Sequence, residues 1–524
     1  MTGPPATVKR DVQRPSAYLI FYGLFALLLF AIHAPFLTLR YFWDELGQFV
    51  PAALDILRRG AWVPRSAVPN AHPPALMAYL AAFWRVFGYS IPATRVAMLL
   101  LASLGALFSL LLAIELCRGV RGTPAFAAVI LLIADPLFYT QAMMAQLDMP
   151  AMALGVAALL FYIQERVVVS AAFCIPLLLT KETAIVFPAV FAADLLLRRR
   201  YRDAALFAPS FVALGLWFVY LHHVTGHWFG DPGFTHYNLI WAMHPARVAV
   251  GILRRAYYLF IADFRWIGAV CLIYALRRTR IFATRAWRIA FSVAVAQTLL
   301  VTVLGGASLE RYLVPVLPIL YAAEAAAFFI LGSRMRVIAF VVMTAGLVSG
   351  WFVNPPFPFP YEDNLAMADF VDLHVAAART LESDYADRAI YTAWPLTAAL
   401  RRPDYGYVRR RLHTVETSDL NYSTLAKLDR SKVQVLVLYS RTWEPSWGVL
   451  RFAFVRDFLH RFYGYEPQMT PEQAQQILAL TPVQRIELHG QWVEILAQSR
   501  PSEPKSVEVR LVQPISRAPS FLTN

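Results

Sequence analysis

Charged residues are scarce in this chain of 524 residues. Only 16% of its residues are Asp, Glu, Lys or Arg, 58% are hydrophobic, and the mean hydropathy is +0.49. A soluble domain carries about 25% charged residues, so the composition excludes an ordinary soluble protein and predicts a polytopic membrane protein. Cysteine is scarcer still, since there are only three cysteines and they follow neither the spacing of a metal site nor that of a disulfide framework.

The net charge of +14 does not indicate nucleic-acid binding. The basic residues stand in short groups between apolar runs, as they do in the cytoplasmic loops of membrane proteins. The sequence shows no internal repeat. Its last part, 361–524, lacks a glycine-rich phosphate loop, a nucleophile elbow and a Cys/His metal spacing, so no motif there indicates a catalytic or metal site.

Long apolar runs are plentiful instead. The first follows a basic N-terminal tail, and although a cleaved signal peptide is an alternative, its length and the spans that follow favour an anchor. The run 170–197 is interrupted by Thr180-Lys181-Glu182. Each half is shorter than the roughly 20 residues that a span needs, so two short helices are predicted to meet inside the bundle. With this run counted as two, about eleven crossings are expected. The others lie near 17–37, 93–114, 125–142, 149–163, 204–222, 264–277, 289–306, 313–332 and 337–354.

Arginine groups between the spans set the predicted orientation. By the positive-inside rule, the side that holds these groups and the N-terminal tail is the cytoplasm. The outer side then receives the long first loop 38–92, the loop 223–262 and the C-terminus. Five arginines fall on this outer side against the rule, and an anionic ligand is one candidate partner for them. They are Arg58, Arg59, Arg65, Arg254 and Arg255.

A stiff, proline-rich linker at 355–360 divides the chain into two predicted domains. Residues 1–354 form a transmembrane domain, and residues 361–524 form a soluble extracytoplasmic domain with an α/β or α+β fold. In the soluble domain a helix is expected over 364–382. Strands are expected over 389–393, 433–439 and 493–497.

An acidic pair, Asp44-Glu45, follows three aromatic residues just past the first span. The rings suit the headgroup layer, whereas the acids need water, a cation or a reacting partner. Two solvated acids beside a helix end are the plain alternative. Further along the same loop, His72 precedes a Pro-Pro pair, and its ordinary role would be that of a solvated loop histidine.

Two other charged groups stand at or within predicted spans. Asp148 lies in a turn of a few residues between two spans, and a bare carboxylate deep in a bilayer costs about 2.5–3.5 kcal/mol. Its structural alternative is to cap the helix that begins at Pro150. Lys181 and Glu182 interrupt a span, and an internal ion pair that lets two half-helices turn is their structural alternative.

Two groups complete the polar residues of the outer side. Arg311-Tyr312 stands at the mouth of a span, where an arginine ordinarily anchors in headgroups. In the loop 223–262, His223 and His227 are four residues apart and could share a helical face that holds a metal, although histidine-rich outer loops usually bind nothing. Since all these groups map to one side of the membrane, they fit a charged substrate at the outer leaflet.

The order of these motifs resembles the GT-C fold glycosyltransferases that use polyprenyl-phosphate sugars. The relevant relatives are the protein O-mannosyltransferase and lipid A aminoarabinose transferase families (glycosyltransferase family 39-like), and the resemblance covers about 15–350. The aminoarabinose transferases have Lys-Pro-Pro after an acid where this chain has Ala71-His72-Pro73-Pro74, which argues against aminoarabinose as the sugar. The resemblance rests on Asp44-Glu45, His72-Pro73-Pro74, Asp148, Thr180-Lys181-Glu182 and Arg311-Tyr312 with Pro315 and Pro318.

The resemblance implies an inverting transferase in the cytoplasmic (inner) membrane. The donor is a polyprenyl-phosphate sugar, and the acceptor is a hydroxyl or amine on a lipid, glycan or protein. Asp44 or Asp148 would be the catalytic base, and cations would stabilise the departing phosphate. A divalent metal is a candidate cofactor, with Asp148, His223 and His227 as candidate ligands. The expected substrate-binding residues are Glu45, His72, Lys181, Glu182, Arg254, Arg255, Arg311 and Tyr312.

Two other classes of protein compete with this hypothesis. A lipid or glycan transporter, or a flippase, would carry polar residues along both halves of a pathway and often inverted repeats. In this sequence the ionisable residues gather towards the outer face. A non-catalytic membrane subunit would tolerate replacement of the outer acids.

Overall fold

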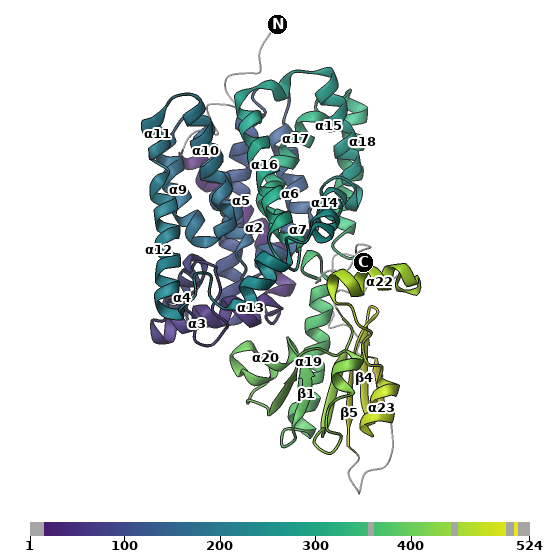
Figure 1. Cartoon of the computed structure of the whole chain (residues 1–524). Coiled ribbons are helices and arrows are strands. Elements are labelled where there is room, and N and C mark those ends of the chain that lie inside the picture. Colours follow the sequence, from purple (N-terminus) through teal and green to yellow (C-terminus); the bar gives the residue numbers. More distant parts are fainter. Residues whose placement is uncertain (1–14, 355–360, 442–448, 499–507, 512–524) are drawn as a thin grey trace. The chain divides into compact units, whose positions relative to one another are not determined.

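Apolar helices fill most of the residues that the structure describes. The structure is a computed structural model, and it describes residues 15–354, 361–441, 449–498 and 508–511. The chain divides into two compact units (Figure 1). The helical unit contains Met1–Ala34, Phe49–Pro355 and Glu362–Asn364. The C-terminal unit contains Pro35–Gln48, Pro356–Tyr361 and Leu365–Asn524. The linker 355–360 predicted from the sequence lies outside the described residues.

The helical unit contains several helices that are long enough to span a membrane. In the described part of the chain, five helices are long and apolar enough to cross a bilayer, or up to seven if each of two bent pairs counts as one span. The prediction of a multi-pass membrane protein is therefore confirmed, while the count of about eleven crossings stays a prediction. The interrupted run is two short helices, α9 (Val167–Thr180) and α10 (Val186–Leu197), as its length predicts.

The remaining helices of this unit follow in chain order. Before α9 come α2 (Pro15–His33), α3 (Val50–Arg59), α4 (Ala75–Phe87), α5 (Ile91–Leu116), α6 (Pro124–Ala134), α7 (Pro136–Met143) and α8 (Asp148–Ile163). After α10 come α11 (Tyr201–Ala205), α12 (Ala208–Thr225), α13 (Pro232–Thr235), the π-helix η4 (His236–Trp241), α14 (Pro245–Phe260), α15 (Arg265–Arg278), α16 (Arg285–Val303), the 3-10 helix η7 (Glu310–Val316), α17 (Leu317–Phe328) and α18 (Ser333–Ser349).

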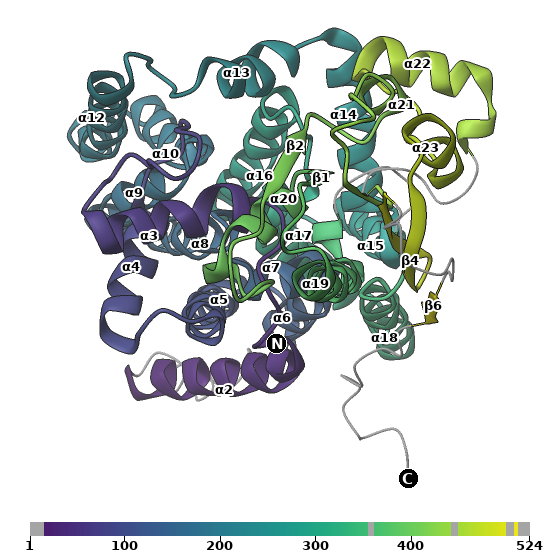
Figure 2. The same cartoon turned by 90° about the horizontal axis from the view of Figure 1, so that it is seen from below.

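Helix α8 lies at the centre of the helical unit. It packs between α5 and α9, while α17 packs against α6 and α15. In Figure 2, α5, α12 and α15 are seen end-on, whereas α3 lies across the view. The sequence predicts 223–262 as a loop. Most of this segment is helical instead, because it contains α13, η4 and α14. The helix α14 is amphipathic, with a buried face that includes Arg255 and Tyr258.

A buried ion pair joins the two bent helix pairs. The break between α6 and α7 bends the chain by 68° at Asp135, whose side chain caps α7 by accepting from the N–H groups of Leu137 and Phe138. The break at Ile261, between α14 and the segment that leads into α15, bends the chain by 49°, and Arg265 lies four residues further along. The Arg265 Nη2 lies 2.6 Å from Asp135 Oδ2, and neither side chain is exposed. The Arg265 Nη1 also lies 2.7 Å from Asp263 Oδ2. The charge of Arg265 is therefore neutralised by Asp135 and Asp263 together, which offsets the cost of burying it.

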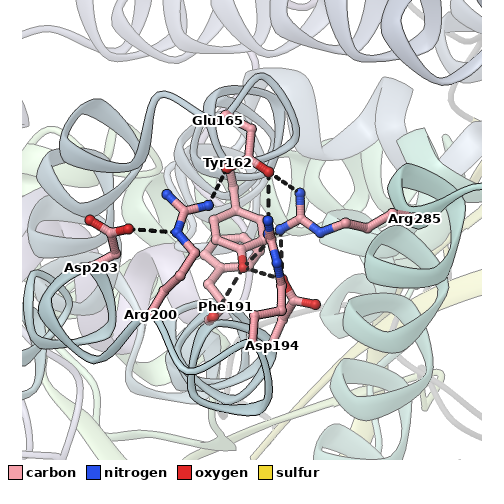
Figure 3. Close-up of polar contacts among 8 residues, drawn as sticks. Tyr162, Glu165, Phe191, Asp194, Arg200, Asp203 and Arg285 are labelled. Carbon is pink, nitrogen blue, oxygen red and sulfur yellow. Dashed lines mark hydrogen bonds and ion pairs between the residues drawn. The ribbon is translucent and has the colours of Figure 1, made fainter.

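A second polar network ties the ends of three helices together (Figure 3). Arg285, at the start of α16, pairs with Glu165 in the turn after α8 and donates to Asp194 of α10 over 2.6 Å. Tyr162 of α8 also donates to Asp194, over 2.6 Å. Arg200 joins the network by pairing with the same Glu165. These residues stand at the predicted cytoplasmic ends of helices α8, α10 and α16.

Removing the guanidinium of Arg285 should destabilise this network only moderately. Glu165 and Arg285 are partly exposed, so we expect Arg285→Ala to lower the free energy of unfolding by about 1–2 kcal/mol. Thermal unfolding in detergent measures this effect. Arg280→Ala is the matched control, because Arg280 is exposed on the loop just before α16. Equal midpoints for the two variants would show that the network contributes nothing to stability.

A mixed sheet forms the core of the C-terminal unit. Its strand order is β2-β1-β3-β5-β4-β6, with β1 parallel to β2 and β3, β5 antiparallel to β3 and β4, and β6 parallel to β4. All five residues of β3 are buried, as expected for a continuous apolar run in a central strand. The strands are β1 (Ile390–Ala393), β2 (Thr414–Thr417), β3 (Val435–Tyr439), β4 (Thr481–Leu488), β5 (Gln491–Ala497) and β6 (Glu508–Leu511).

Helices α19, α20 and α23 pack against this sheet. The longest, α19 (Ala366–Asp384), corresponds to the helix expected over 364–382 and packs against β4 and β5. The three runs predicted as strands are β1, β3 and β5. The other helices are α20 (Leu396–Arg401), the 3-10 turn η9 (Pro403–Tyr405), α21 (Tyr422–Leu425), the 3-10 turn η10 (Val449–Arg451), α22 (Ala453–Tyr463) and α23 (Pro471–Leu478).

Part of the predicted first outer loop belongs to the C-terminal unit. The Tyr407 hydroxyl donates to the Tyr41 carbonyl over 2.8 Å, and the Phe42 ring lies 5.4 Å from that of Phe370. Tyr41 and Phe42 are almost fully buried. The expectation that these rings lie in the headgroup layer is therefore wrong, because they pack into the core of the C-terminal unit.

Candidate functional site

Three chain segments bring the principal charged residues together. Asp148 is the first residue of α8 and Lys181 directly follows α9, where its extended backbone ends the helix. Arg311 lies in η7, which packs against α8. The alternative reading of Asp148 as the cap of the following helix is wrong, because Leu147 occupies the N-cap position and the Asp148 side chain faces two cations.

Asp148 lies between those two cations. Lys181 Nζ donates to Asp148 Oδ1, and Arg311 Nε lies 3.6 Å from Asp148 Oδ2. All three side chains are at most 5% exposed. Each of these charges would be costly to bury alone, because an unpaired ion in a low-dielectric interior loses its hydration. The sequence predicts the three residues as site candidates, and the structure brings them together.

Glu362 is a member of this cluster that the sequence reasoning missed. Its carboxylate lies 3.3 Å from Arg311 Nε and accepts a hydrogen bond of 3.0 Å from Gln146 Nε2. The Thr140 hydroxyl donates to the Glu362 backbone carbonyl. The sequence feature that could have identified Glu362 is the acidic pair Glu362-Asp363 just after the proline-rich linker. This pair resembles Asp44-Glu45, which follows the first span.

Arg254 and Arg255 extend the cluster along α14. Arg254 forms a bidentate pair with Glu310, with both N–O distances at 2.6 Å, and Glu310 is fully buried. Arg255 Nη1 donates to the Leu309 carbonyl over 2.6 Å, whereas its buried Nε has no hydrogen-bond acceptor among the described residues. Burial raises the pKa of the neighbouring Asp363 well above its usual value, and the negative charge of Glu310 raises it further.

We call these eight residues the charged cluster. Its cations are Lys181, Arg254, Arg255 and Arg311, and its acids are Asp148, Glu310, Glu362 and Asp363. The site thus gathers four cations, and three of them, Lys181, Arg255 and Arg311, are buried. Such a group of charged N–H donors is suited to an anionic ligand.

The ring of Tyr312 lies among the cations of the charged cluster. Lys181 Nζ lies 4.3 Å from the ring centroid, and the guanidinium carbons of Arg311 and Arg255 lie 5.6 Å and 6.0 Å from it. The negative face of an aromatic ring attracts cations without a formal charge. Tyr312 therefore helps to hold these cations close together and leaves their net charge unchanged.

His72 and Glu182 form a separate pair beside the charged cluster. The His72 Nδ1 lies 3.0 Å from Glu182 Oε2, and both side chains are 20% exposed. The interpretation of Lys181-Glu182 as an internal ion pair is therefore wrong, because Lys181 pairs with Asp148 and Glu182 with His72. The 3-10 helix that begins at Glu182 directs the two neighbouring side chains to different partners.

The described residues do not form a metal site. Helix α12 ends at Thr225 and Gly226 adopts a left-handed conformation, so His223 and His227 do not share a helical face. The prediction of a shared helical face is therefore wrong, while their role as metal ligands stays a prediction. Asp148 is held by cations, and no group of three or more His, Cys, Asp or Glu within the described ranges is arranged to hold a metal. We therefore derive no reaction step through a metal.

Asp44 and Glu45 belong to the C-terminal unit, whereas all the residues of the charged cluster belong to the helical unit. Asp44 is half-buried and accepts a hydrogen bond of 3.1 Å from Gln48. Glu45 is fully buried, and its Oε2 accepts the Phe42 backbone N–H over 2.9 Å. This hydrogen bond from Phe42 to Glu45 stabilises the turn that contains Asp44.

Comparison with known proteins identifies the fold. No protein-family model and no curated protein sequence matches the chain. Among solved structures, the chain is similar to ArnT, an aminoarabinose transferase, from Cupriavidus metallidurans bound to undecaprenyl phosphate. The TM-score is 0.52 at 15% sequence identity, and the match covers 92% of this chain and 98% of ArnT. The fold is the GT-C fold. The predicted resemblance to this class of glycosyltransferases is thereby confirmed at the level of the fold.

Two other GT-C structures match with lower scores. The oligosaccharyltransferase AglB from Archaeoglobus fulgidus, in complex with an inhibitory peptide and a dolichol-phosphate, gives a TM-score of 0.47 at 9% identity over 80% of this chain and 69% of AglB. The arabinofuranosyltransferase AftD from Mycobacteria gives 0.46 at 14% identity over 94% of this chain and 40% of AftD. The match to ArnT includes more of this GT-C chain than the segment 15–350 on which the sequence resemblance rests.

Proposed function

We propose that this GT-C protein is an inverting glycosyltransferase that moves a sugar from a polyprenyl-phosphate carrier to an acceptor hydroxyl or amine. The supporting observation is the charged cluster, which gathers four cations, three of them buried. In a chain with the fold of ArnT, such a cluster is suited to the phosphate of a lipid carrier. We place the reaction at the outer face of the cytoplasmic membrane.

Lys181 and Arg311 are the proposed partners of the donor phosphate, with Arg255 beside them. When the bond between the anomeric carbon and the phosphate oxygen breaks, its electron pair leaves with the phosphate, and the added negative charge needs cations nearby. Asp148 and Glu362 hold these cations before the donor binds. The buried Arg255 Nε is a donor without an acceptor among the described residues, so it is available to an anionic oxygen.

Asp44 is the proposed base. The acceptor oxygen forms the new bond to the anomeric carbon while its proton passes to the Asp44 carboxylate. A single displacement of this kind inverts the configuration. Asp148 is the weaker candidate, because a proton on its carboxylate would remove the charge that balances Lys181 and Arg311. Asp148 therefore holds cations in this proposal, Glu45 supports Asp44, and the His72–Glu182 pair contributes to substrate binding.

Release of the lipid phosphate tests the proposed function. The full-length protein in detergent is incubated with candidate polyprenyl-phosphate sugars and acceptors, and polyprenyl phosphate is measured together with the anomeric configuration of the product. We expect release that depends on the acceptor, and a product of inverted configuration. Movement of intact donor across vesicles without cleavage would favour a transporter, and retention of configuration would contradict the single displacement.

A further inference from the structure

Helix α22 of the C-terminal unit divides cleanly into an apolar and a polar face. At 100° per residue, its bulky apolar side chains fall on one half of the helix, while Arg456, Asp457, His460 and Arg461 fall on the other. Arg456 and Arg461 stand at the two borders between the faces. The apolar half consists of Phe454, Val455, Phe458, Leu459, Phe462 and Tyr463.

The apolar half of α22 is covered only in part. Phe454 is 71% exposed, and the other five apolar side chains are neither buried nor fully exposed. Two of the three exposed large hydrophobic side chains among the described residues of the C-terminal unit, Phe452 and Phe454, stand at its start. The helix α23 is similarly amphipathic but buries Pro471, Ala474 and Leu478. An apolar face that stays partly exposed in this way indicates an interaction surface.

The packing and charge of α22 indicate what the surface binds. Its main packing partner among the described elements is the turn η10 directly before it, so the helix stands apart from the sheet. Arg456 and Arg461 border the apolar half, Arg451 stands in η10 directly before the helix, and α22 carries one acid, Asp457. One nitrogen of Arg456, Nη1, donates to the backbone carbonyls of Leu450 and Arg451. Arginines at the borders of an apolar face extend their charge towards lipid headgroups while their stems lie along the apolar surface.

We propose that α22 lies on the surface of the bilayer that the helical unit spans, with its apolar half inserted at the headgroup boundary and its arginines on anionic headgroups. The C-terminal unit follows shortly after the apolar helix α18 in the chain, so the membrane in which α18 is expected to lie is near this unit. A short amphipathic helix with aromatic residues and arginines binds such a surface through apolar burial and attraction to anionic lipid. The inference does not depend on the proposed transferase activity.

Spin labels on the two faces of α22 test this inference. The full-length protein carries Cys271→Ser, which leaves the two buried native cysteines, and a single new cysteine by Phe454→Cys or, as the control, Asp457→Cys. Each labelled protein is placed in vesicles of phosphatidylethanolamine and phosphatidylglycerol. Collisions with oxygen, which concentrates in lipid, are compared with collisions with a water-soluble nickel chelate. We expect the label at 454 to collide mainly with oxygen and the label at 457 mainly with nickel.

Three outcomes would overturn the proposal. Equal access of nickel to both labels would place the apolar half in water. Exclusion of both reagents from the label at 454 would show that protein covers it, either the helical unit or a second copy of the chain. In pure phosphatidylcholine, which carries no net charge, we expect the difference in oxygen and nickel collisions between the two labels to fall by about twofold or more. An unchanged difference would show that the arginines do not bind anionic headgroups.

Discussion

The Asp44→Asn variant should lose sugar transfer by a factor of about 10²–10⁴, the usual contribution of a general base. The side chain keeps its shape, and its carbonyl oxygen can still accept the hydrogen bond from Gln48, so the turn closed by Glu45 is preserved. The substitution removes the negative charge of the carboxylate and, with it, the ability to take up a proton. The measurement is the initial rate of polyprenyl phosphate release at saturating acceptor, together with thermal unfolding to verify the fold.

Asp387→Asn is the matched control for this experiment. It makes the same chemical change on an exposed side chain in the turn after α19, in the same unit, and should leave both the rate and the unfolding midpoint unchanged. If Asp44→Asn turns over within about twofold of the native rate, Asp44 is not the base, because loss of a general base has a far larger effect. Asp148 would then be the remaining candidate.

Features that depend on local chemistry could be predicted from the sequence. The apolar runs specify membrane helices because only a helix satisfies every backbone hydrogen bond in lipid. The break at Lys181 follows from the length of its two halves. Charged residues in or beside apolar runs, such as Asp148, Lys181 and Arg311, stand out because burial of an unpaired charge is costly. For these the sequence located the residues, and the structure supplied their contacts.

The choice of partners could not be predicted, because it depends on contacts between distant segments. Lys181 pairs with Asp148 and not with its neighbour Glu182. Glu362 joins the charged cluster from beyond the last apolar helix, in a region where the sequence suggested only a soluble domain. The residues 35–48 group with the C-terminal unit through aromatic packing, a tertiary contact that no local pattern in the loop reveals.

The buried Lys181–Asp148 pair allows stability and function to be separated. Lys181→Met leaves Asp148 without its closest cation, and loss of one partner from a buried pair costs about 3–5 kcal/mol. We therefore expect a large fall in the unfolding midpoint and loss of transfer. In the double variant Lys181→Met/Asp148→Asn neither charge remains, and Arg311 still faces Glu362, so most of the stability should return.

Transfer should not return with the stability of the double variant. If Lys181 stabilises the departing phosphate, its loss costs activity whether or not Asp148 is neutralised. Lys432→Met is the control, because Lys432 and Asp429 form an exposed pair whose loss should change neither stability nor rate. Rates and midpoints for the native protein, both single variants and the double variant form a complete cycle. Recovery of activity together with stability would show that Lys181 only neutralises Asp148, and the phosphate role would pass to Arg311 and Arg255.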